Sequence, residues 1–367
     1  MTTKKKNALI IAYNDLNNSG VPNVIYQTIK ALHDIVNFDV VVFGDDLYYY
    51  TKLVDEGIKN VNIINLHKEK PKNKLGRINY ELFSNPKYQY KESIKLMKDK
   101  QYDIVHSFQE YNGWPILKAA TEMDIQKRIV HSNIIHCEKK NFLVKRNKKR
   151  TLKYATTFVG VTKDSCEHAW AGKKYTIIHN GYDESRFKFT NSKLNEDELV
   201  ITHISTYSEN KNQLFTIELT KELKLLYPKT KLRIVGAVRD KGYFLRMKKA
   251  INEGGASEWI DVVDGSAGVE SFPAKTTFYI LPSIHEGASL VAVESQACGI
   301  KMFASTGVPQ EMNVGGITYL GLNDGPKKWA KAIYEEFKKS GNRRTAYDVS
   351  SFSSERFKKN IYNLYFK

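Results

Sequence analysis

The chain is predicted to be an α/β protein with two Rossmann-like domains in tandem. Short apolar segments typical of buried strands alternate with helical segments along nearly the whole sequence, in two series. A polar stretch without a clear period, at residues 186–198, separates the two series. The length of 367 residues is sufficient for two domains that each bury a core of their own.

Each series is expected to form a parallel sheet with helices on both faces. The strands of the first series are expected at residues 8–13, 38–43, 61–66, 103–106, 128–131, 157–161 and 175–179. Those of the second are expected at residues 199–205, 232–236, 259–263, 277–281 and 300–304. We therefore place one domain at residues 1–183, a second at residues 184–349, and a closing helix at residues 350–367, where Phe357, Ile361 and Leu364 recur at helical spacing.

The composition is that of a globular protein with a strong positive charge. Hydrophobic residues make up 41% of the chain, and the formal net charge is +17. Such a charge favours an anionic partner, which could be a lipid surface, a substrate or a nucleic acid. Because no helix-turn-helix, zinc-ligand or RNA-binding signature accompanies the charge, we expect no nucleic acid partner.

The cysteines and the N-terminus favour a cytoplasmic protein. Cys137, Cys166 and Cys298 are an odd number without close pairing, which does not indicate a disulfide framework. The N-terminus has no apolar signal segment, and no stretch approaches about 18 uninterrupted apolar residues. We expect a protein that stays in the cytoplasm and does not span the membrane.

The most informative stretch contains two glutamates, Glu286 and Glu294, eight residues apart between two expected strands. A helix is expected to open between them, so that the carboxylates are separated by about 12 Å along its axis. This spacing suits one carboxylate that faces a transferred sugar and another that faces the ribose of the same nucleotide. A simpler interpretation makes both glutamates solvated, although Glu294 lies beside the apolar stripe of Leu290, Val293 and Ala297, where an idle carboxylate is costly.

The turn between the two glutamates is suited to a diphosphate. The backbone N–H groups of Ala288, Ser289 and Leu290, together with the positive end of the helix, are expected to hold the phosphates. Gly287 and Ala288 leave the backbone open to such a ligand because neither carries a bulky side chain.

The stretch from Pro282 to Gly299 resembles the Glu-x7-Glu motif of the retaining family 4 glycosyltransferases. Other stretches are similar to the family's blocks and occur in the family's order; they begin at Asp103, His179, Ser208 and Leu232. The sequence from Pro309 to Tyr319 resembles that of the family branch that builds capsular and exopolysaccharides in bacteria. Each stretch alone is weakly specific, and together they are specific.

The resemblance implies a GT-B fold, in which two Rossmann-like domains face each other across a cleft. It implies that Glu286 orients the donor sugar, that Glu294 holds the ribose and that Lys211 binds the diphosphate. Gly20, in a loop similar to the family's glycine pair but with Ser19 in place of the first glycine, is expected to approach the phosphate as well. No Asp-x-Asp and no His/Cys cluster with ligand spacing stands at a strand end, so we expect neither a metal nor another cofactor.

The acceptor side departs from the family pattern. Asn133 stands where the family carries a histidine, with His131 two residues earlier and His136 three residues later. Both histidines are candidates to replace it, and a structural role explains each of them as well. His106 is expected to line the same cleft, and Asn180 to lie near the hinge.

A second departure concerns the diphosphate. The family has an arginine five residues before its phosphate-binding lysine, and here that position is Thr206. Arg233, Arg239 or a group of the first domain would have to supply the missing charge.

The first half of the chain contains two strongly basic segments. Eight Lys or Arg residues and no acidic ones lie from Lys139 to Lys153, and a second run extends from Lys68 to Arg77. We interpret both as docking surfaces for the inner leaflet or for a lipid-linked acceptor, with a solvated lysine-rich surface as the alternative.

The sequence therefore predicts a retaining glycosyltransferase of cell-surface polysaccharide synthesis. It transfers a hexosyl or N-acetylhexosaminyl unit from a nucleoside diphosphate sugar, with a UDP-sugar favoured, to a glycan or lipid-linked glycan hydroxyl. Two alternatives stay open. The first is a catalytically inactive GT-B partner subunit, motivated by Thr206 and Asn133, and the second is a nucleotide-sugar epimerase on the same scaffold.

Overall fold

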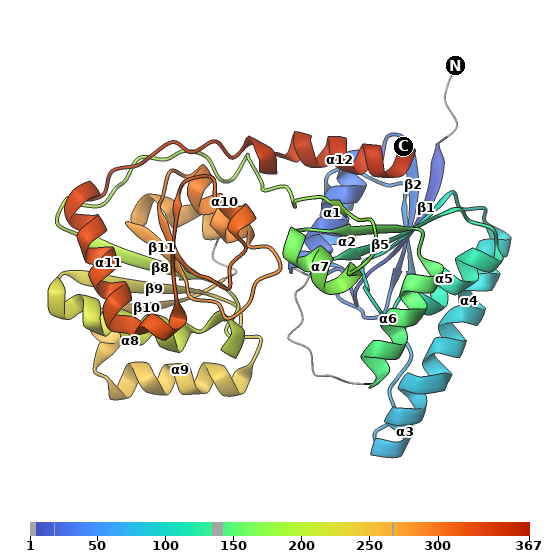
Figure 1. Ribbon diagram of the computed structural model, residues 1–367, viewed down its shortest axis with the longest axis horizontal. Coiled ribbons are helices and arrows are strands. Elements are labelled where there is room, and N and C mark those ends of the chain that lie inside the picture. The colour runs from blue at the N-terminus through green and yellow to red at the C-terminus, as the bar shows by residue number, and fades with distance from the viewer. Residues whose placement is uncertain (1–4, 18, 134–141, 266–267) are drawn as a thin grey trace. The chain divides into compact units, whose positions relative to one another are not determined.

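The computed structural model describes residues 5–17, 19–133, 142–265 and 268–367 (Figure 1). The chain divides into two compact units. Unit 1 comprises Met1–Gly181 with Glu355–Lys367, and unit 2 comprises Tyr182–Ser354. The division thus falls after residues 181 and 354, where the sequence placed it after residues 183 and 349.

Unit 1 is built on a seven-stranded parallel sheet with the order β3-β2-β1-β4-β5-β6-β7. Its strands are β1 (Lys6–Ile11), β2 (Val36–Val42), β3 (Val61–Asn65), β4 (Ile104–Ser107), β5 (Lys127–Ser132), β6 (Thr157–Gly160) and β7 (Thr176–Ile177). The strand order reverses between β1 and β4, which pair in register. In doubly wound folds, ligands bind at the carboxyl ends of the strands on either side of such a reversal.

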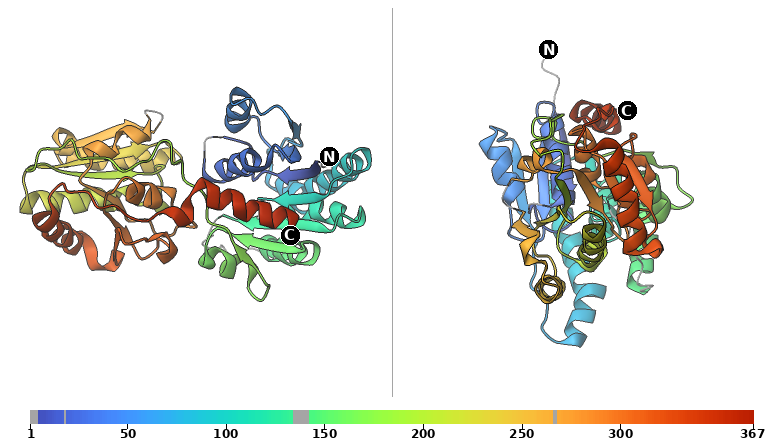
Figure 2. Two further views of the ribbon diagram at one scale, coloured as in Figure 1. Left: turned by 90° about the horizontal axis from the view of Figure 1, so that it is seen from above. Right: turned by 90° about the vertical axis from the view of Figure 1, so that its left-hand side faces the viewer.

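Helices cover both faces of this sheet (Figure 2). They are α1 (Gly20–Leu32), α2 (Tyr48–Asp55), α3 (Lys74–Asn79), the π-helical turn η1 (Tyr80–Ser84), α4 (Asn85–Asp99), α5 (Trp114–Glu122), α6 (Phe142–Tyr154) and α7 (Lys163–Trp170). Helix α1 begins at Gly20, and Pro22 is its third residue. Two buried apolar clusters result, one on each face of the sheet.

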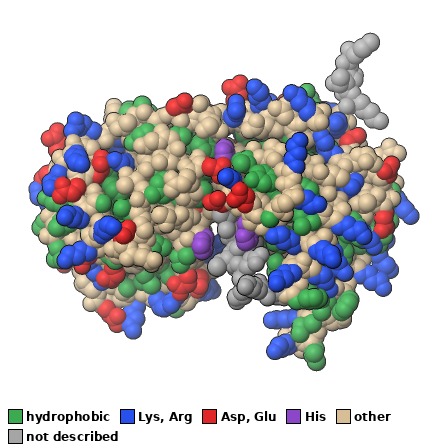
Figure 3. Space-filling view, viewed as in Figure 1, with side chains coloured by type: hydrophobic (Ala, Val, Ile, Leu, Met, Phe, Trp, Pro, Cys, Tyr) green, Lys and Arg blue, Asp and Glu red, His purple; other side chains and the backbone are tan. Residues whose placement is uncertain are grey.

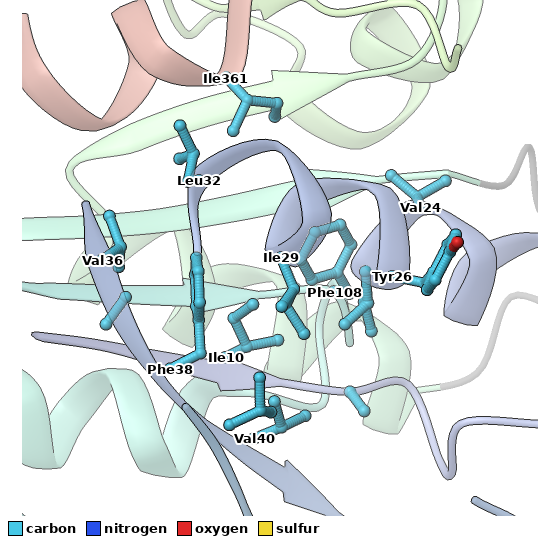
Figure 4. Packing of buried hydrophobic residues seen from close by; sticks show 14 of the residues in the cluster. Ile10, Val24, Tyr26, Ile29, Leu32, Val36, Phe38, Val40, Phe108 and Ile361 are labelled. Atoms are coloured by element: carbon cyan, nitrogen blue, oxygen red, sulfur yellow. The ribbon is translucent and has the colours of Figure 1, made fainter. Parts of the chain in front are cut away.

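The C-terminal helix α12 (Ser354–Phe366) completes one of these clusters. Its residues Phe357, Ile361 and Tyr365 are at most 3% exposed, and they pack with strand residues such as Ile10 and Phe38 (Figure 4). Phe357 and Ile361, both predicted from the apolar spacing, therefore lie in the buried stripe of this helix, whereas Leu364 is half-buried and Tyr365 takes the third buried position.

Replacing Ile361 with alanine is expected to lower the free energy of unfolding of unit 1 by about 2–4 kcal/mol, because Ile361 is fully buried and the site cannot collapse completely. Lys359→Ala, on the exposed side of the same helix, is the matched control and should change it by less than about 0.5 kcal/mol. Urea unfolding of the full chain measures both. Equal midpoints for the two variants would show that α12 does not belong to the core of unit 1.

Unit 2 is built on a six-stranded parallel sheet with the order β10-β9-β8-β11-β12-β13. Its strands are β8 (Leu199–Ile204), β9 (Thr230–Gly236), β10 (Ile260–Asp264), β11 (Phe278–Leu281), β12 (Met302–Ser305) and β13 (Ile317–Leu320). Strand β13 is absent from the sequence prediction, since it has only four residues and follows two glycines. The strand order reverses between β8 and β11.

The helices of unit 2 are α8 (Gln213–Leu226), α9 (Lys241–Glu253), α10 (Leu290–Ala297) and α11 (Gly325–Ser340). Short 3-10 turns link the elements: η2 (Glu209–Lys211), η3 (Ala256–Glu258), η4 (Val269–Ser271), η5 (Pro273–Lys275), η6 (Gln310–Met312), η7 (Leu322–Asp324) and η8 (Ser350–Phe352). Apolar residues of α8, α9 and α11 close one face of the sheet, and those of α10 pack on the other.

Candidate active site

The glutamate motif and the predicted phosphate-binding lysine meet at the strand-order reversal of unit 2. Lys211 lies in the turn η2 that follows β8, and Glu286 lies in the loop that follows β11. The Lys211 Nζ is 2.5 Å from the Glu286 Oε1. This ion pair stands at the carboxyl ends of the two strands where a doubly wound sheet is expected to bind its ligand.

The ion pair is largely withdrawn from water. The side chain of Glu286 is 7% exposed, and that of Lys211 is 22% exposed. The Ser283 hydroxyl donates a second hydrogen bond to the Glu286 Oε1, at 2.6 Å. One carboxylate oxygen is therefore held by two donors from two loops, and the ammonium retains further N–H groups for another acceptor.

Asn210 holds the two loops together. Its side-chain amide donates to the His285 carbonyl at 2.8 Å and accepts from the His285 N–H at 3.1 Å. Its own carbonyl accepts from the Ile284 N–H at 2.8 Å. Asn210 was not among the predicted site residues, although its position next to Lys211 was a usable signal, because a lysine placed against a second loop needs an anchor there.

The loop after β12 supports Glu286 from the other side. The Glu286 N–H donates to the Gly307 carbonyl at 2.9 Å. A Cβ atom at position 307 would lie 2.2 Å from the Ile284 carbonyl oxygen, so this close approach requires a glycine. The backbone of the glutamate loop is thus fixed on both sides before any ligand binds.

A buried polar network lies behind Lys211. The imidazole of His203 makes hydrogen bonds of 2.8 Å to the hydroxyls of Thr216 and Ser205, and Gln213 donates to the Ser205 hydroxyl and to the Thr206 carbonyl. Desolvation, with the charge of Lys211 as a smaller cause, lowers the pKa of His203 to about 3. This histidine therefore stays neutral and anchors the turn that carries the lysine.

The turn after Glu286 presents free backbone donors. Helix α10 begins at Leu290 with Ser289 as its N-cap. The Ser289 hydroxyl accepts from the Ala292 N–H. Among the described residues, the N–H groups of Ala288, Ser289 and Leu290 donate to no other group, and a phosphate is the kind of ligand that such a set binds.

Glu294 lies on α10 in a partly buried position, and its carboxylate has no hydrogen-bond partner within the described ranges. Burial raises the pKa of this carboxyl to about 7, Arg186 opposes the rise, and Asp183 and Glu270 add to it. Arg186 is itself paired with Glu270. A ligand with hydroxyl groups can supply the donors that the Glu294 carboxylate lacks.

The affinity for UDP is therefore expected to increase as the pH rises through about 7. The pKa of Glu294 is raised, so its carboxyl is protonated below that pH and becomes an acceptor for the ribose hydroxyls above it. Calorimetric titration of UDP between pH 6 and 8 measures this effect. Glu294→Gln is the control, since the phosphate of UDP titrates equally in both proteins; the same pH dependence in the variant would contradict a role for Glu294.

The missing arginine is not replaced by Arg233. Arg233 is paired with Asp261 and donates to the Lys275 carbonyl, so its charge is already used. Arg239, in contrast, is exposed in the loop after β9 and forms no ion pair within the described part of the chain. Of the two arginines, Arg239 is therefore the one available for an anionic ligand near Thr206.

Two of the histidines predicted for the acceptor side, His106 and His131, lie in the core of unit 1. His106 and His131 are fully buried, and their rings stack with each other at 5.5 Å and with Phe108 at 4.3 and 5.0 Å. The His106 Nδ1 is hydrogen-bonded to the Tyr365 hydroxyl of α12. Both rings are withdrawn from the surface of unit 1, and the Nε2 of His106 and both ring nitrogens of His131 have no partner among the described residues. Their catalytic and cleft-lining roles stay predictions.

The remaining predicted residues of the first half are placed as follows. Asn133 follows β5 with both amide atoms buried and unpartnered among the described residues, and the Asn180 Oδ1 is buried in the same manner. Gly20 opens α1, and a Cβ atom there would meet nothing within 4 Å. His136 lies outside the described residues.

The described residues include no group of metal ligands, no cysteine pair and no helix able to span a membrane. In those ranges no group of three or more His, Cys, Asp or Glu side chains is arranged to hold a metal ion. Cys166 and Cys298 are both buried free thiols, whereas Cys137 lies outside the described ranges. None of the helices in the described part of the chain is both long and apolar enough to cross a bilayer.

Comparison with known proteins finds a family match for unit 2. Residues 184–346, nearly all of unit 2, match the family described as glycosyl transferases group 1. A curated relative from Staphylococcus aureus, the capsular polysaccharide biosynthesis glycosyltransferase CapH, is 22% identical over 213 residues. The match covers 55% of this chain and 59% of the length of that relative.

Solved structures show the same fold over almost the whole chain. HepE from Anabaena, in complex with UDP and glucose, has a TM-score of 0.75 at 16% identity and covers 97% of this chain and 98% of its own. The lipopolysaccharide outer core galactosyltransferase WaaB has a TM-score of 0.71 at 14% identity, over 98% and 99% of the two chains. A Staphylococcus aureus TarM variant in complex with fondaparinux, α-GlcNAc-glycerol and UDP has a TM-score of 0.70 at 12% identity, over 99% and 100%.

The two parallel-sheet units thus have the GT-B fold of nucleotide-sugar transferases. Residues 184–346 are thus similar to the glycosyl transferases group 1, and the fold of the whole chain is similar to that of solved GT-B glycosyltransferases. The resemblance that the glutamate motif suggested is therefore confirmed.

Proposed function

We propose that this protein transfers a sugar from a UDP-sugar to a hydroxyl of a glycan or lipid-linked glycan, with retention of the anomeric configuration, in cell-surface polysaccharide synthesis. The observation that carries the proposal is the Lys211 and Glu286 ion pair beside the three unbonded N–H groups of Ala288, Ser289 and Leu290. A cation, oriented backbone donors and a buried carboxylate are the groups that a sugar diphosphate requires.

Each group has a role in the proposed reaction. Lys211 and the three N–H groups stabilise the negative charge that grows on the leaving diphosphate, a contribution that is usually the largest in such transfers. Glu286 orients the donor sugar, and Glu294 holds the ribose. The leaving diphosphate accepts the proton of the incoming hydroxyl, so that no protein base is required and no metal is invoked.

The preference for UDP is supported by the relatives. HepE and the TarM variant have been solved with UDP. The role in polysaccharide synthesis is supported by CapH, whose name assigns it to capsular polysaccharide biosynthesis.

A product assay tests the proposed reaction. The full chain is incubated with UDP-glucose, UDP-galactose, UDP-N-acetylglucosamine or UDP-N-acetylgalactosamine and a panel of octyl glycosides, and the anomeric proton of the first product is observed by NMR. The proposal expects one donor to give an α-linked product. A β-linked product would refute retention, and no product with any donor would favour the inactive partner subunit that Thr206 and Asn133 suggest.

We further propose that unit 1 docks on the inner face of the cytoplasmic membrane. Seven Lys and Arg side chains line a groove of about 830 Å³ along α6: Lys145, Arg146, Lys148, Lys149, Arg150, Lys153 and Lys173. Basic and hydrophobic side chains also gather around α3 near the tip of unit 1 (Figure 3). There Leu75 is 82% exposed and Phe83 is 63% exposed, and apolar side chains with a basic rim are typical of a peripheral membrane surface.

Neutralising Lys145, Arg146, Lys148 and Lys149 is expected to weaken binding to anionic vesicles by at least tenfold, because each basic residue near an anionic surface contributes about 1 kcal/mol. Co-sedimentation with phosphatidylglycerol vesicles measures the effect, with phosphatidylcholine vesicles as the uncharged reference. A variant with four neutralised lysines on unit 2, Lys221, Lys248, Lys249 and Lys331, controls for net charge. An equal loss of vesicle binding in both variants would contradict the proposal that this surface docks on the membrane.

A further inference from the structure

Unit 1 contains a ligand-sized pocket of its own, with a volume of about 700 Å³. Tyr13 and Asn14, which follow β1, and Gln109 and Glu110, which follow β4, line it together with residues of α4 and α6. The pocket therefore lies where the strand order of unit 1 reverses. Its volume is within the range of small-molecule sites, which makes it a binding site by position and by size.

The loop after β4 is held rigidly at this pocket. Glu110 has a φ of 47°, a left-handed conformation that is costly for a residue with a side chain. The Ser132 hydroxyl donates to the Glu110 carboxylate at 2.6 Å, and the Thr151 hydroxyl contacts the carbonyls of Glu110 and Tyr111. Two other elements of unit 1 thus fix the strained loop, and strain of this kind is typical of binding sites.

The pocket contains buried acceptor atoms that lack donors. Gln109 is 7% exposed, its amide N–H donates to the Tyr13 carbonyl at 3.1 Å, and its Oε1 has no partner among the described residues. Because a carbonyl can only accept, this bond fixes the orientation of the Gln109 amide. The buried Asn147 Oδ1 also lines the pocket without a partner in the described ranges, and so does the His168 Nε2, which accepts or donates according to its tautomer.

These atoms define the chemistry of the ligand. A buried acceptor requires a ligand that donates hydrogen bonds, which a hydroxyl does and a phosphate or carboxylate does not. The charges of the lining residues also balance, with Lys68 and Lys70 against Glu81 and Glu110. The pocket is therefore built for an uncharged, hydroxyl-bearing ligand.

Aromatic rings supply the complementary apolar surface. Tyr13 is 42% exposed, and Trp114 lines the same pocket with the Arg150 guanidinium 4.2 Å from the centre of its ring. A pyranose ring presents C–H groups on its faces and hydroxyls at its edge, and an indole or phenol ring offers it an apolar face.

We propose that this pocket binds a neutral glycosyl unit of the acceptor, with the Gln109 Oε1 and the Asn147 Oδ1 accepting hydrogen bonds from its hydroxyls. The assignment to the acceptor rests on the proposed transferase function, whereas the binding of a neutral sugar does not. Gln109 and Asn147 are thus specificity residues of unit 1, separate from the donor-binding groups of unit 2.

Saturation-transfer NMR tests the proposal with the full chain and saturating UDP. The probes are methyl glucoside, methyl galactoside and methyl N-acetylglucosaminide, each as both anomers, with glucose 1-phosphate as the anionic probe. We expect at least one methyl glycoside to receive saturation, and we expect the signal to fall at least fivefold in Gln109→Leu and in Asn147→Leu. Glu286→Gln, which alters the donor site, should retain the signal.

Three outcomes would overturn the proposal. They are no signal from any methyl glycoside, a signal lost in Glu286→Gln but retained in both unit 1 variants, and stronger binding of glucose 1-phosphate than of the methyl glycosides. UDP binding is measured on the same samples. If UDP binds and no glycoside does, the inference fails while the proposed function stands; if a glycoside binds in the unit 1 pocket and UDP does not bind, the proposed function fails.

Discussion

Turnover of the UDP-sugar is expected to fall by about 100-fold or more in Glu286→Ala, while the chain stays folded. A group that positions a substrate contributes about this much when its removal shifts the reacting atoms by about 1 Å. Folding survives because the Lys211 side chain is 22% exposed and can be hydrated once its partner is removed. Release of UDP from the preferred donor and the melting temperature are the two measurements.

Lys211→Met separates charge stabilisation from positioning. Loss of the ammonium is expected to lower kcat by about 100- to 1,000-fold, as the loss of one preorganised donor does in other transfer reactions. Lys221→Met is the matched control, since this lysine is paired with Glu218 on the outside of α8. Full activity in either Glu286→Ala or Lys211→Met would contradict the assignment of the site.

Acidification is expected to destabilise both units at a higher pH than that at which the exposed carboxylates become protonated. Burial lowers the pKa of His131 and of His203 to about 3, and burial, with His131 as a lesser cause, lowers that of His106 well below its usual range. The unfolded chain therefore binds more protons than the folded chain below about pH 6.5. The contribution of these histidines to the free energy of unfolding is fully present above that pH. For His131 and His203, this contribution falls by about 1.4 kcal/mol per pH unit and per histidine as the pH falls from 6.5 toward 3.

His131→Phe isolates this effect in unit 1. The phenyl ring keeps the stack with Phe108 but does not titrate, so the variant should lose about 1.4 kcal/mol less than the wild type between pH 7.5 and 5.5. Glu294, whose pKa is raised to about 7, acts in the opposite direction in this window, but equally in both proteins. Urea unfolding at the two pH values measures the difference, and identical losses would show that His131 is not held neutral by the fold.

The sequence was sufficient for the fold, and the structure brings together Lys211 and Glu286, two residues of the predicted donor site. The strands are continuous apolar runs because both of their faces are buried, which makes them legible without a structure. Lys211 and Glu286 were predicted because the stretches that carry them resemble blocks of a known family. Strand β13 was missed, since four residues after two glycines carry too weak a pattern.

The residues of the acceptor side could not be predicted from the sequence in the same way. His106 and His131 stand near the ends of strands, and a one-residue change in side-chain direction separates a residue that faces the core from one that faces a ligand. Gln109 and Asn147 carry no motif, because their function depends on which neighbours already satisfy them. Asn210 was missed although it stands next to Lys211, because its partners are backbone groups of a loop 75 residues away in the sequence.

The most direct test of the donor site is the thermal stability of the full chain with UDP, GDP, ADP and CMP, in the wild type and in Glu286→Ala. At a hundredfold excess over its dissociation constant, a true ligand adds about 2.7 kcal/mol. We expect UDP to raise the melting temperature above all others, and the additional shift from its sugar nucleotide to disappear in Glu286→Ala. No shift with any nucleotide would contradict the assignment of this protein as a UDP-sugar transferase.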